Sequence, residues 1–174
     1  MINRKSFITG IKGVKLSKQE IRFLNRHKPW GIILFSRNLK NINQVKDLTK
    51  HIRKIFRDKK YPIMIDQEGG RVNRLEKFIS LDSLTSEYFG QLFIKNKQQF
   101  NLIYKLYIDQ TSNLLIRMGI NINTVPVLDL RYKGSSNIIG DRSYSKNPKI
   151  VSQIGDICIK SCLLYTSDAA DERH

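Results

Sequence analysis

Short, continuous apolar runs alternate along this chain with longer segments that are apolar on one side only. The clearest runs are residues 30–35, 61–65 and 120–128, and each is typical of a strand that is buried on both faces. Residues 9–15 are a weaker candidate for a first strand. Strands that alternate with helices predict right-handed βαβ units and a parallel sheet. The expected fold class is therefore α/β.

Three helical segments are predicted between these runs. The first covers residues 18–27 and starts at a capping box, in which Ser17 and Glu20 would satisfy free backbone N–H groups reciprocally. The second covers residues 42–56, where apolar residues recur every three or four positions. The third is one long stretch over residues 92–118, and the glycine that follows it is expected to be its C-cap.

Two architectures fit this order of elements, a doubly wound sheet and a (β/α)₈ barrel. The glycine-rich patterns that bind nucleotide phosphates are absent from the sequence, which argues against nucleotide binding. In both architectures the active site lies at the carboxyl ends of the strands. Polar residues gather at these positions, and they are Ser36, Arg37, Asn38, Asp66, Gln67, Glu68, Asp129 and Arg131.

The chain is strongly basic, with 31 Lys and Arg against 15 Asp and Glu and a formal net charge of +16. Such an excess is typical of nucleic-acid-binding modules, which are the alternative from another functional class. The basic residues are scattered, however, and the abundance of Lys, Ile and Asn is explained by an AT-rich genome. No apolar run approaches the ~18 residues that cross a bilayer. We expect a cytoplasmic protein that binds neither nucleic acid nor membrane.

The densest group of candidate functional residues is DQEGGRVNR at positions 66–74. Its two glycines allow the backbone to leave the preceding strand sharply and to approach a ligand closely. The Asp66 carboxylate could accept hydrogen bonds from two sugar hydroxyls, and Arg71 and Arg74 could share one face of the following turn. This outline suits a polyol or a carbohydrate. The alternative is that Asp66 caps a helix and the arginines are solvated.

A second group is GDRSY at positions 140–144. Asp141 could orient the guanidinium of Arg142, which could then donate to a carbonyl or hydroxyl of a ligand. The spacing alone favours a surface turn with a weak ion pair. Residues 36–38 similarly fit a turn with an Asx cap better than ligand contacts, and Asp129 fits a structural carboxylate. The three histidines lack the spacing of metal ligands; they are His27, His51 and His174.

Taken together, four segments resemble glycoside hydrolase family 3. They are GIILFSRN at 31–38, IDQEGGRVNRL at 65–75, NTVPVLDL at 123–130 and IGDRSYSKNP at 139–148. They are most similar to the cytoplasmic β-N-acetylhexosaminidases of peptidoglycan recycling within that family. The resemblance covers about residues 6–160. A family-3 β-glucosidase or another glycosidase is the alternative within the hydrolases.

The resemblance implies a (β/α)₈ barrel that removes terminal β-linked N-acetylglucosamine from a muropeptide or a chitooligosaccharide with retention of configuration. The sugar-binding residues of the family fall on Asp66, Arg74 and Arg142. Arg71 belongs to the same motif and is expected to support its loop. The resemblance implies no metal and no organic cofactor.

The catalytic groups that retention requires are not expected in this chain. Retaining hydrolysis needs a nucleophile and an acid/base. In the family these groups, together with a Lys-His sugar-binding pair, follow the fifth strand, whereas only four strands are predicted here. We therefore expect the N-terminal half of a (β/α)₈ barrel, truncated after about four strands and inactive by itself.

Residues 162–174 resemble the translation of an adapter used in DNA sequencing libraries. We therefore expect residues 1–161 to be a fragment of the family-3 N-terminal catalytic domain, and residues 162–174 to be a non-native tail. The tail residues with reactive or charged side chains are expected to have no function. They are Cys162, Asp168, Asp171, Glu172 and His174.

Overall fold

A computed structural model describes residues 4–132, 134 and 136–171, with side chains as far as residue 162. Glu172 and His174 lie outside the described residues, as do the side chains of Asp168 and Asp171. The chain divides into two units. Unit 1 comprises Met1–Gln67, Arg74–Ser80 and Leu115–Thr124, and unit 2 comprises Glu68–Asn73, Leu81–Leu114 and Val125–His174.

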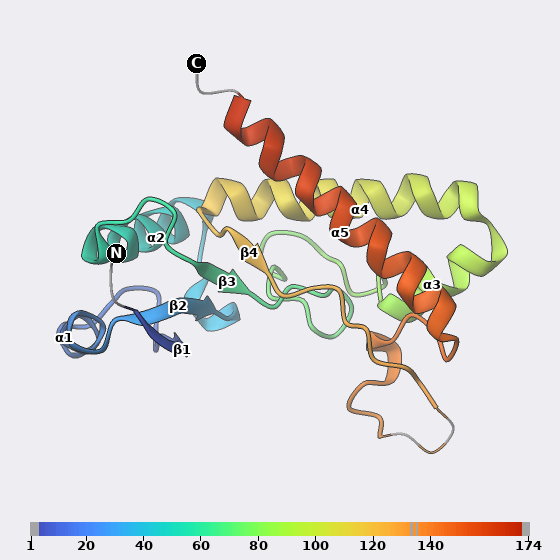
Figure 1. The fold of residues 1–174 in the computed structure, drawn as a ribbon, viewed down its shortest axis with the longest axis horizontal. Coiled ribbons are helices and arrows are strands. Elements are labelled where there is room, and N and C mark those ends of the chain that lie inside the picture. Colours follow the sequence, from blue (N-terminus) through green and yellow to red (C-terminus); the bar gives the residue numbers. More distant parts are fainter. Residues whose placement is uncertain (1–3, 133, 135, 172–174) are drawn as a thin grey trace. The chain divides into compact units, whose positions relative to one another are not determined.

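Unit 1 contains a parallel sheet of four strands in the order β1-β2-β3-β4 (Figure 1). The strands are β1 (Lys5–Gly10), β2 (Pro29–Leu34), β3 (Ile63–Ile65) and β4 (Ile122–Asn123). In the register, Gly10 pairs with Ile33, Leu34 with Ile65, and Ile65 with Asn123. Because the strands are parallel, their carboxyl ends share one edge of the sheet. The predicted α/β class with a parallel sheet is confirmed.

Five α-helices and two short 3₁₀ helices are described. The α-helices are α1 (Lys18–His27), α2 (Ile42–Phe56), α3 (Ser86–Lys95), α4 (Lys97–Met118) and α5 (Pro148–Asp171). The 3₁₀ helices are η1 (Ser36–Asn38) and η2 (Gly140–Arg142). Helix α1 begins with the predicted capping box of Ser17 and Glu20. The bounds of α1 and α2 agree with the prediction because local apolar spacing and capping determine them.

The predictions of the first and last strands were only partly right. The first strand is β1, and residues 11–15 lie after it. Strand β1 is at the edge of the sheet and its residues are exposed or half-buried, so it lacks the apolar run of a central strand. Strand β4 has two residues, although its apolar run continues to residue 128. Pro126 has no backbone N–H to donate to a ladder, so it cannot prolong the pairing.

The single long helix predicted over residues 92–118 is wrong, because two helices meet at Asn96. The N–H of Asn96 donates to Leu92 at the end of α3, whereas its side-chain oxygen accepts from the N–H of Gln99 at the start of α4. An Asn side chain that accepts from a backbone N–H in this way is a helix N-cap. The predicted C-cap is confirmed, since Gly119 follows α4 with a φ of 76°.

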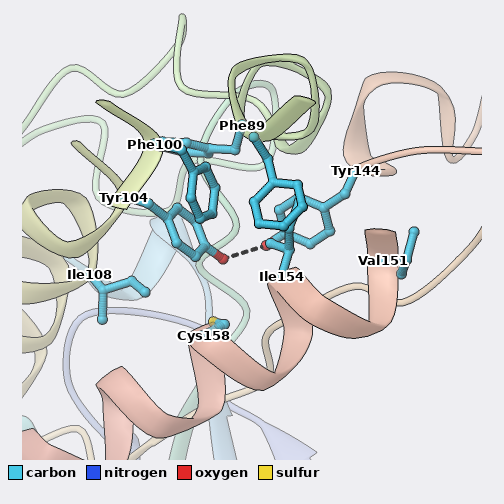
Figure 2. Packing of buried hydrophobic residues seen from close by; sticks show 9 residues of the cluster. Phe89, Phe100, Tyr104, Ile108, Tyr144, Val151, Ile154 and Cys158 are labelled. Carbon is cyan, nitrogen blue, oxygen red and sulfur yellow. Dashed lines mark hydrogen bonds between the residues drawn. The ribbon is translucent and has the colours of Figure 1, made fainter. Parts of the chain in front are cut away.

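Aromatic residues dominate the core of unit 2. Figure 2 shows this cluster, to which α3, α4 and α5 all contribute. At its centre the hydroxyls of Tyr104 and Tyr144 share a hydrogen bond of 2.8 Å (Figure 2). Burial raises the pKa of both phenols above their usual range, so they stay protonated.

None of the helices among the described residues combines the length and the apolar character of a membrane span.

The turn after β2 is built around the side chain of Asn38, which is fully buried. Its oxygen accepts from the N–H of Phe35 at 2.9 Å, and its amino group donates to the carbonyls of Ile11 at 3.1 Å and Gly13 at 2.9 Å. The interpretation of residues 36–38 as a side-chain-capped turn is therefore confirmed.

We expect Asn38→Ala to destabilise unit 1 by about 2 kcal/mol, because it leaves buried backbone groups without partners. Urea unfolding followed by the fluorescence of Trp30, which is in unit 1, measures this loss. The matched control is Asn25→Ala. Asn25 is exposed and donates to Ile21 within α1, so its loss should change stability by no more than about 0.5 kcal/mol. Equal losses in the two variants would contradict this account of the turn.

Candidate functional site

Asp66 and Arg74, two of the three predicted sugar-binding residues, lie together in unit 1. Asp66 directly follows β3, and its Oδ2 atom is 3.3 Å from Nη2 of Arg74. Its Oδ1 atom is 3.2 Å from the hydroxyl of Thr124, which directly follows β4. The Asp66 and Arg74 side chains are each 27% exposed. The pair is therefore at the carboxyl edge of the sheet and within reach of solvent.

The alternative that Asp66 caps a helix is wrong, because among the described residues the next helix after β3 is α3. Buried Gln67 gives the loop its shape instead. Its Oε1 atom accepts from the backbone N–H groups of Arg74 at 2.7 Å and Leu75 at 3.0 Å. Its own N–H donates to the side chain of Asn123 at 3.0 Å. Gln67 thus ties the Arg74 backbone to the residue that ends β4.

Arg74 also lies over an aromatic ring at the end of β2. The centre of its guanidinium is 5.6 Å from the ring centroid of Phe35, and that of Arg37 is 4.6 Å from the same ring. Both distances are within the range of cation–π attraction. The Nε atom of Arg37 donates to the carbonyl of Ile11 at 3.1 Å. Phe35 therefore supports both guanidinium groups of unit 1 at this edge.

Arg142, the third predicted sugar-binding residue, belongs to unit 2 and pairs with Glu68. Its Nε and Nη2 atoms donate to the two carboxylate oxygens of Glu68 at 2.7 and 2.6 Å. The Glu68 side chain is 3% exposed and that of Arg142 is 24% exposed. The possibility that Asp141 orients the guanidinium of Arg142 is therefore wrong. The residue that does so is 74 positions away in the sequence, so no local pattern could identify it.

Asp141 pairs instead with Arg71. The Nε atom of Arg71 is 2.8 Å from Oδ1 of Asp141, and its Nη2 atom donates to the carbonyls of Asn137 at 2.9 Å and Ile139 at 3.0 Å. Arg71 therefore supports the loop that leads into η2, whereas it was expected to support the loop of its own motif.

The two glycines of the 66–74 motif pack against their own chain. Gly69 and Gly70 have φ values of 84° and 53°, which side chains rarely adopt. A Cβ atom on Gly69 would lie 2.6 Å from the carbonyl oxygen of Leu84, and one on Gly70 would lie 2.8 Å from the Thr85 side chain. Within unit 2, the close approach that the glycines allow is therefore to the segment before α3.

The backbone of Glu68 is fixed to the aromatic core of unit 2. The hydroxyl of Tyr107 donates to the Glu68 carbonyl at 2.8 Å, and the N–H of Glu68 donates to the carbonyl of Val72 at 3.1 Å. Burial raises the pKa of Tyr107 above its usual range, so its hydroxyl remains a donor. Arg142 is tied to the same core through Tyr144, which follows it by two residues. The core thus holds both sides of this ion pair.

The remaining candidates are not members of these ion pairs. Asp129 is exposed, and its backbone carbonyl accepts from the hydroxyl of Ser143 at 2.7 Å. His27 stacks on Phe23 in α1, with ring centroids 4.6 Å apart, and His51 is exposed on α2. Among the residues that the structure describes, no three His, Cys, Asp or Glu side chains are grouped as metal ligands.

Comparisons with known proteins connect this chain with one group of enzymes. The N-terminal domain of glycosyl hydrolase family 3 matches residues 5–163. A β-hexosaminidase of Haemophilus ducreyi is 39% identical over 140 residues, which are 80% of this chain and 39% of the relative. A β-hexosaminidase of Thioalkalivibrio sulfidiphilus is 30% identical over 145 residues, or 83% of this chain and 41% of the relative.

The fold agrees with a solved structure from the same group. NagZ of Neisseria gonorrhoeae, crystallised in complex with N-trifluoroacetyl-D-glucosamine, superposes with a TM-score of 0.83 at 30% sequence identity. The match covers 93% of this chain and 48% of NagZ. The chain thus spans between 39% and 48% of the length of these relatives.

Proposed function

Because the chain belongs to glycosyl hydrolase family 3, we propose that it forms the N-terminal, sugar-binding part of a β-N-acetylhexosaminidase. The complete enzyme would hydrolyse terminal β-linked N-acetylglucosamine with retention. The curated relatives support this activity by their names, and NagZ supports the sugar by the N-acylated glucosamine in its crystals. A retaining mechanism requires a nucleophile and an acid/base. Neither role falls on a residue of this chain in this proposed function.

The proposed sugar-binding residues are Asp66, Arg74 and Arg142. The observation that carries the proposal is the Asp66–Arg74 pair beside Thr124, which offers acceptors and donors next to each other at the carboxyl edge of the sheet. Each carboxylate oxygen has two acceptor positions, so Asp66 can accept from sugar hydroxyls in addition to its present partners. Hydrogen bonds to ionised groups are about twice as strong as neutral ones, which suits ring hydroxyls.

The natural substrate and the cellular location of the complete enzyme are also proposed. We place the enzyme in the cytoplasm, where it would act on muropeptides during peptidoglycan recycling or on chitooligosaccharides, without nucleic acid or membrane as a partner. We also propose that residues 1–161 are a fragment of the family-3 N-terminal catalytic domain and that residues 162–174 are foreign to it.

We expect Asp66→Asn to weaken the binding of N-acetylglucosamine by about tenfold or more, because an amide forms weaker hydrogen bonds with hydroxyls than a carboxylate does. Titration of the ¹⁵N-labelled chain, followed by amide chemical shifts, measures this affinity, with glucose as the competing ligand. Asp47→Asn is the matched control, since Asp47 is exposed on α2. Unchanged affinity in Asp66→Asn, or tighter binding of glucose than of N-acetylglucosamine, would contradict the proposal.

A further inference from the structure

A shallow depression in unit 2 is lined by four charged side chains whose charges cancel. The charged residues of its lining are Glu68, Arg71, Asp141 and Arg142. The charged residues form two separate ion pairs, Arg142 with Glu68 and Arg71 with Asp141. A third arginine of unit 2, Arg131, likewise pairs with Glu87. The charges of the side chains at this depression sum to zero, although the whole chain has a net charge of +16.

The two ion pairs at the depression differ in burial. The Arg71 and Asp141 side chains are 46% and 36% exposed, whereas Glu68 is only 3% exposed. Solvent screens the first pair strongly and the second much less. Both Glu68 oxygens accept from Arg142, and the Tyr107 hydroxyl fixes the Glu68 backbone. The carboxylate is therefore a fixed negative charge in direct contact with the Nε and Nη2 atoms of Arg142.

An arginine without such compensation is a strong binding group for phosphate and carboxylate, because its charge and its planar donors act together. The charge of Glu68 opposes the attraction of Arg142 for an anion. Nε and Nη2 of Arg142 donate to Glu68, and Nη1 donates to the carbonyl of Ile138 at 3.4 Å. A guanidinium carries five N–H donors, so a neutral hydroxyl or amide oxygen can accept from it in addition to these partners. An anionic ligand at this guanidinium would be repelled by the Glu68 carboxylate, whose oxygens lie 2.7 and 2.6 Å from Nε and Nη2.

We propose that Glu68 is a specificity-determining residue, which makes Arg142 select uncharged sugar oxygens over phosphate or carboxylate groups. Glu68 acts through Arg142 and is therefore a positioning residue as well. The identity of the neutral ligand rests on the proposed function, whereas the discrimination against anions rests on the ion pair itself.

The test is Glu68→Gln, which keeps the shape and one acceptor oxygen but removes the charge. The probes are inorganic phosphate, N-acetylglucosamine 6-phosphate and N-acetylglucosamine, titrated against the chain while the ¹⁵Nε signal of Arg142 is observed. We expect Glu68→Gln to gain at least about fivefold in affinity for inorganic phosphate at low ionic strength, and the gain to shrink as salt is added. A change that is only structural would not create affinity for an anion.

Two control variants locate the effect. Glu87→Gln removes a carboxylate from an exposed Glu–Arg pair and should show no comparable gain. The double variant Glu68→Gln with Arg142→Gln should lose the gain. A folded Glu68→Gln variant without increased phosphate affinity would overturn the inference. So would an equal gain in Glu87→Gln.

Should Glu68→Gln fail to fold, the unmodified chain decides the question. Saturable, salt-sensitive phosphate binding at its Arg142 signal would overturn the inference, and the absence of such binding would support it. The outcome is separable from the proposed function. A chain that does not bind N-acetylglucosamine, but gains phosphate affinity in Glu68→Gln, would disprove the proposed function and support the role of Glu68. A chain that binds N-acetylglucosamine, but gains no phosphate affinity in Glu68→Gln, would support the proposed function and disprove the role of Glu68.

Discussion

Gly90→Ala is expected to destabilise unit 2 by at least about 3 kcal/mol, because there is no space for a side chain at this position. A Cβ atom on Gly90 would lie 1.7 Å from the carbonyl oxygen of Tyr144 and 2.6 Å from its carbonyl carbon. These are backbone atoms, so no rotamer change can relieve the overlap. The segment that carries Tyr144 would have to move away from α3, and the hydrogen bond between Tyr104 and Tyr144 would be strained or lost.

Hydrogen exchange measured by mass spectrometry on peptides from α3 and α4 reports on unit 2 directly. Protection of these peptides should fall sharply in Gly90→Ala. Gly13→Ala is the matched control, because a Cβ atom at Gly13 meets nothing within 4 Å. Its effect should be no more than about 0.5 kcal/mol. Preserved protection in Gly90→Ala would show that α3 does not lie against Tyr144 as the structure describes.

Arg142→Ala is expected to cost about 3 kcal/mol of stability, because it leaves the buried Glu68 carboxylate without its charged partner. Arg131→Ala breaks a pair in which the side chains are 44% and 38% exposed, and it should cost less than about 1 kcal/mol. Thermal unfolding followed by circular dichroism compares the two variants. The difference between them measures the effect of burial on an ion pair of the same residue types.

The double variant Arg142→Ala with Glu68→Gln provides the control. If the cost in Arg142→Ala arises from an unpaired buried charge, neutralising Glu68 should restore part of the lost stability. No recovery in the double variant would mean that Arg142 stabilises unit 2 by packing alone. Equal losses in Arg142→Ala and Arg131→Ala would likewise contradict a special contribution from the buried carboxylate.

The elements that could be predicted from sequence are those with a local physical cause. Apolar spacing and the capping box of Ser17 and Glu20 gave α1 and α2 their bounds. The continuous apolar run of residues 61–65 indicated β3, which is buried throughout. The prediction failed at Asn96 because the apolar pattern continues across it, while a single side-chain cap divides α3 from α4.

The candidate site also combines features that could be predicted from sequence with features that could not. The 66–74 motif identified Asp66 and Arg74, which the structure brings together in unit 1. It did not identify the structural role of Gln67, whose side chain holds the backbone of Arg74 and Leu75. A buried glutamine that accepts from backbone N–H groups cannot be distinguished from a solvated one by its sequence position. The hydrogen-bonding capacity is a property of the residue, but the partners depend on the fold.

The sequence by itself determined the α/β class, the order of most elements, the family and the motif residues, because apolar periodicity and short motifs are properties of neighbouring positions. Only the tertiary structure decided which charges pair. Asp141, adjacent to Arg142, binds Arg71, whereas Arg142 binds Glu68 from a distant segment. The physical reason is burial. A carboxylate that is almost completely removed from water requires a charged partner, and the fold determines which carboxylate that is.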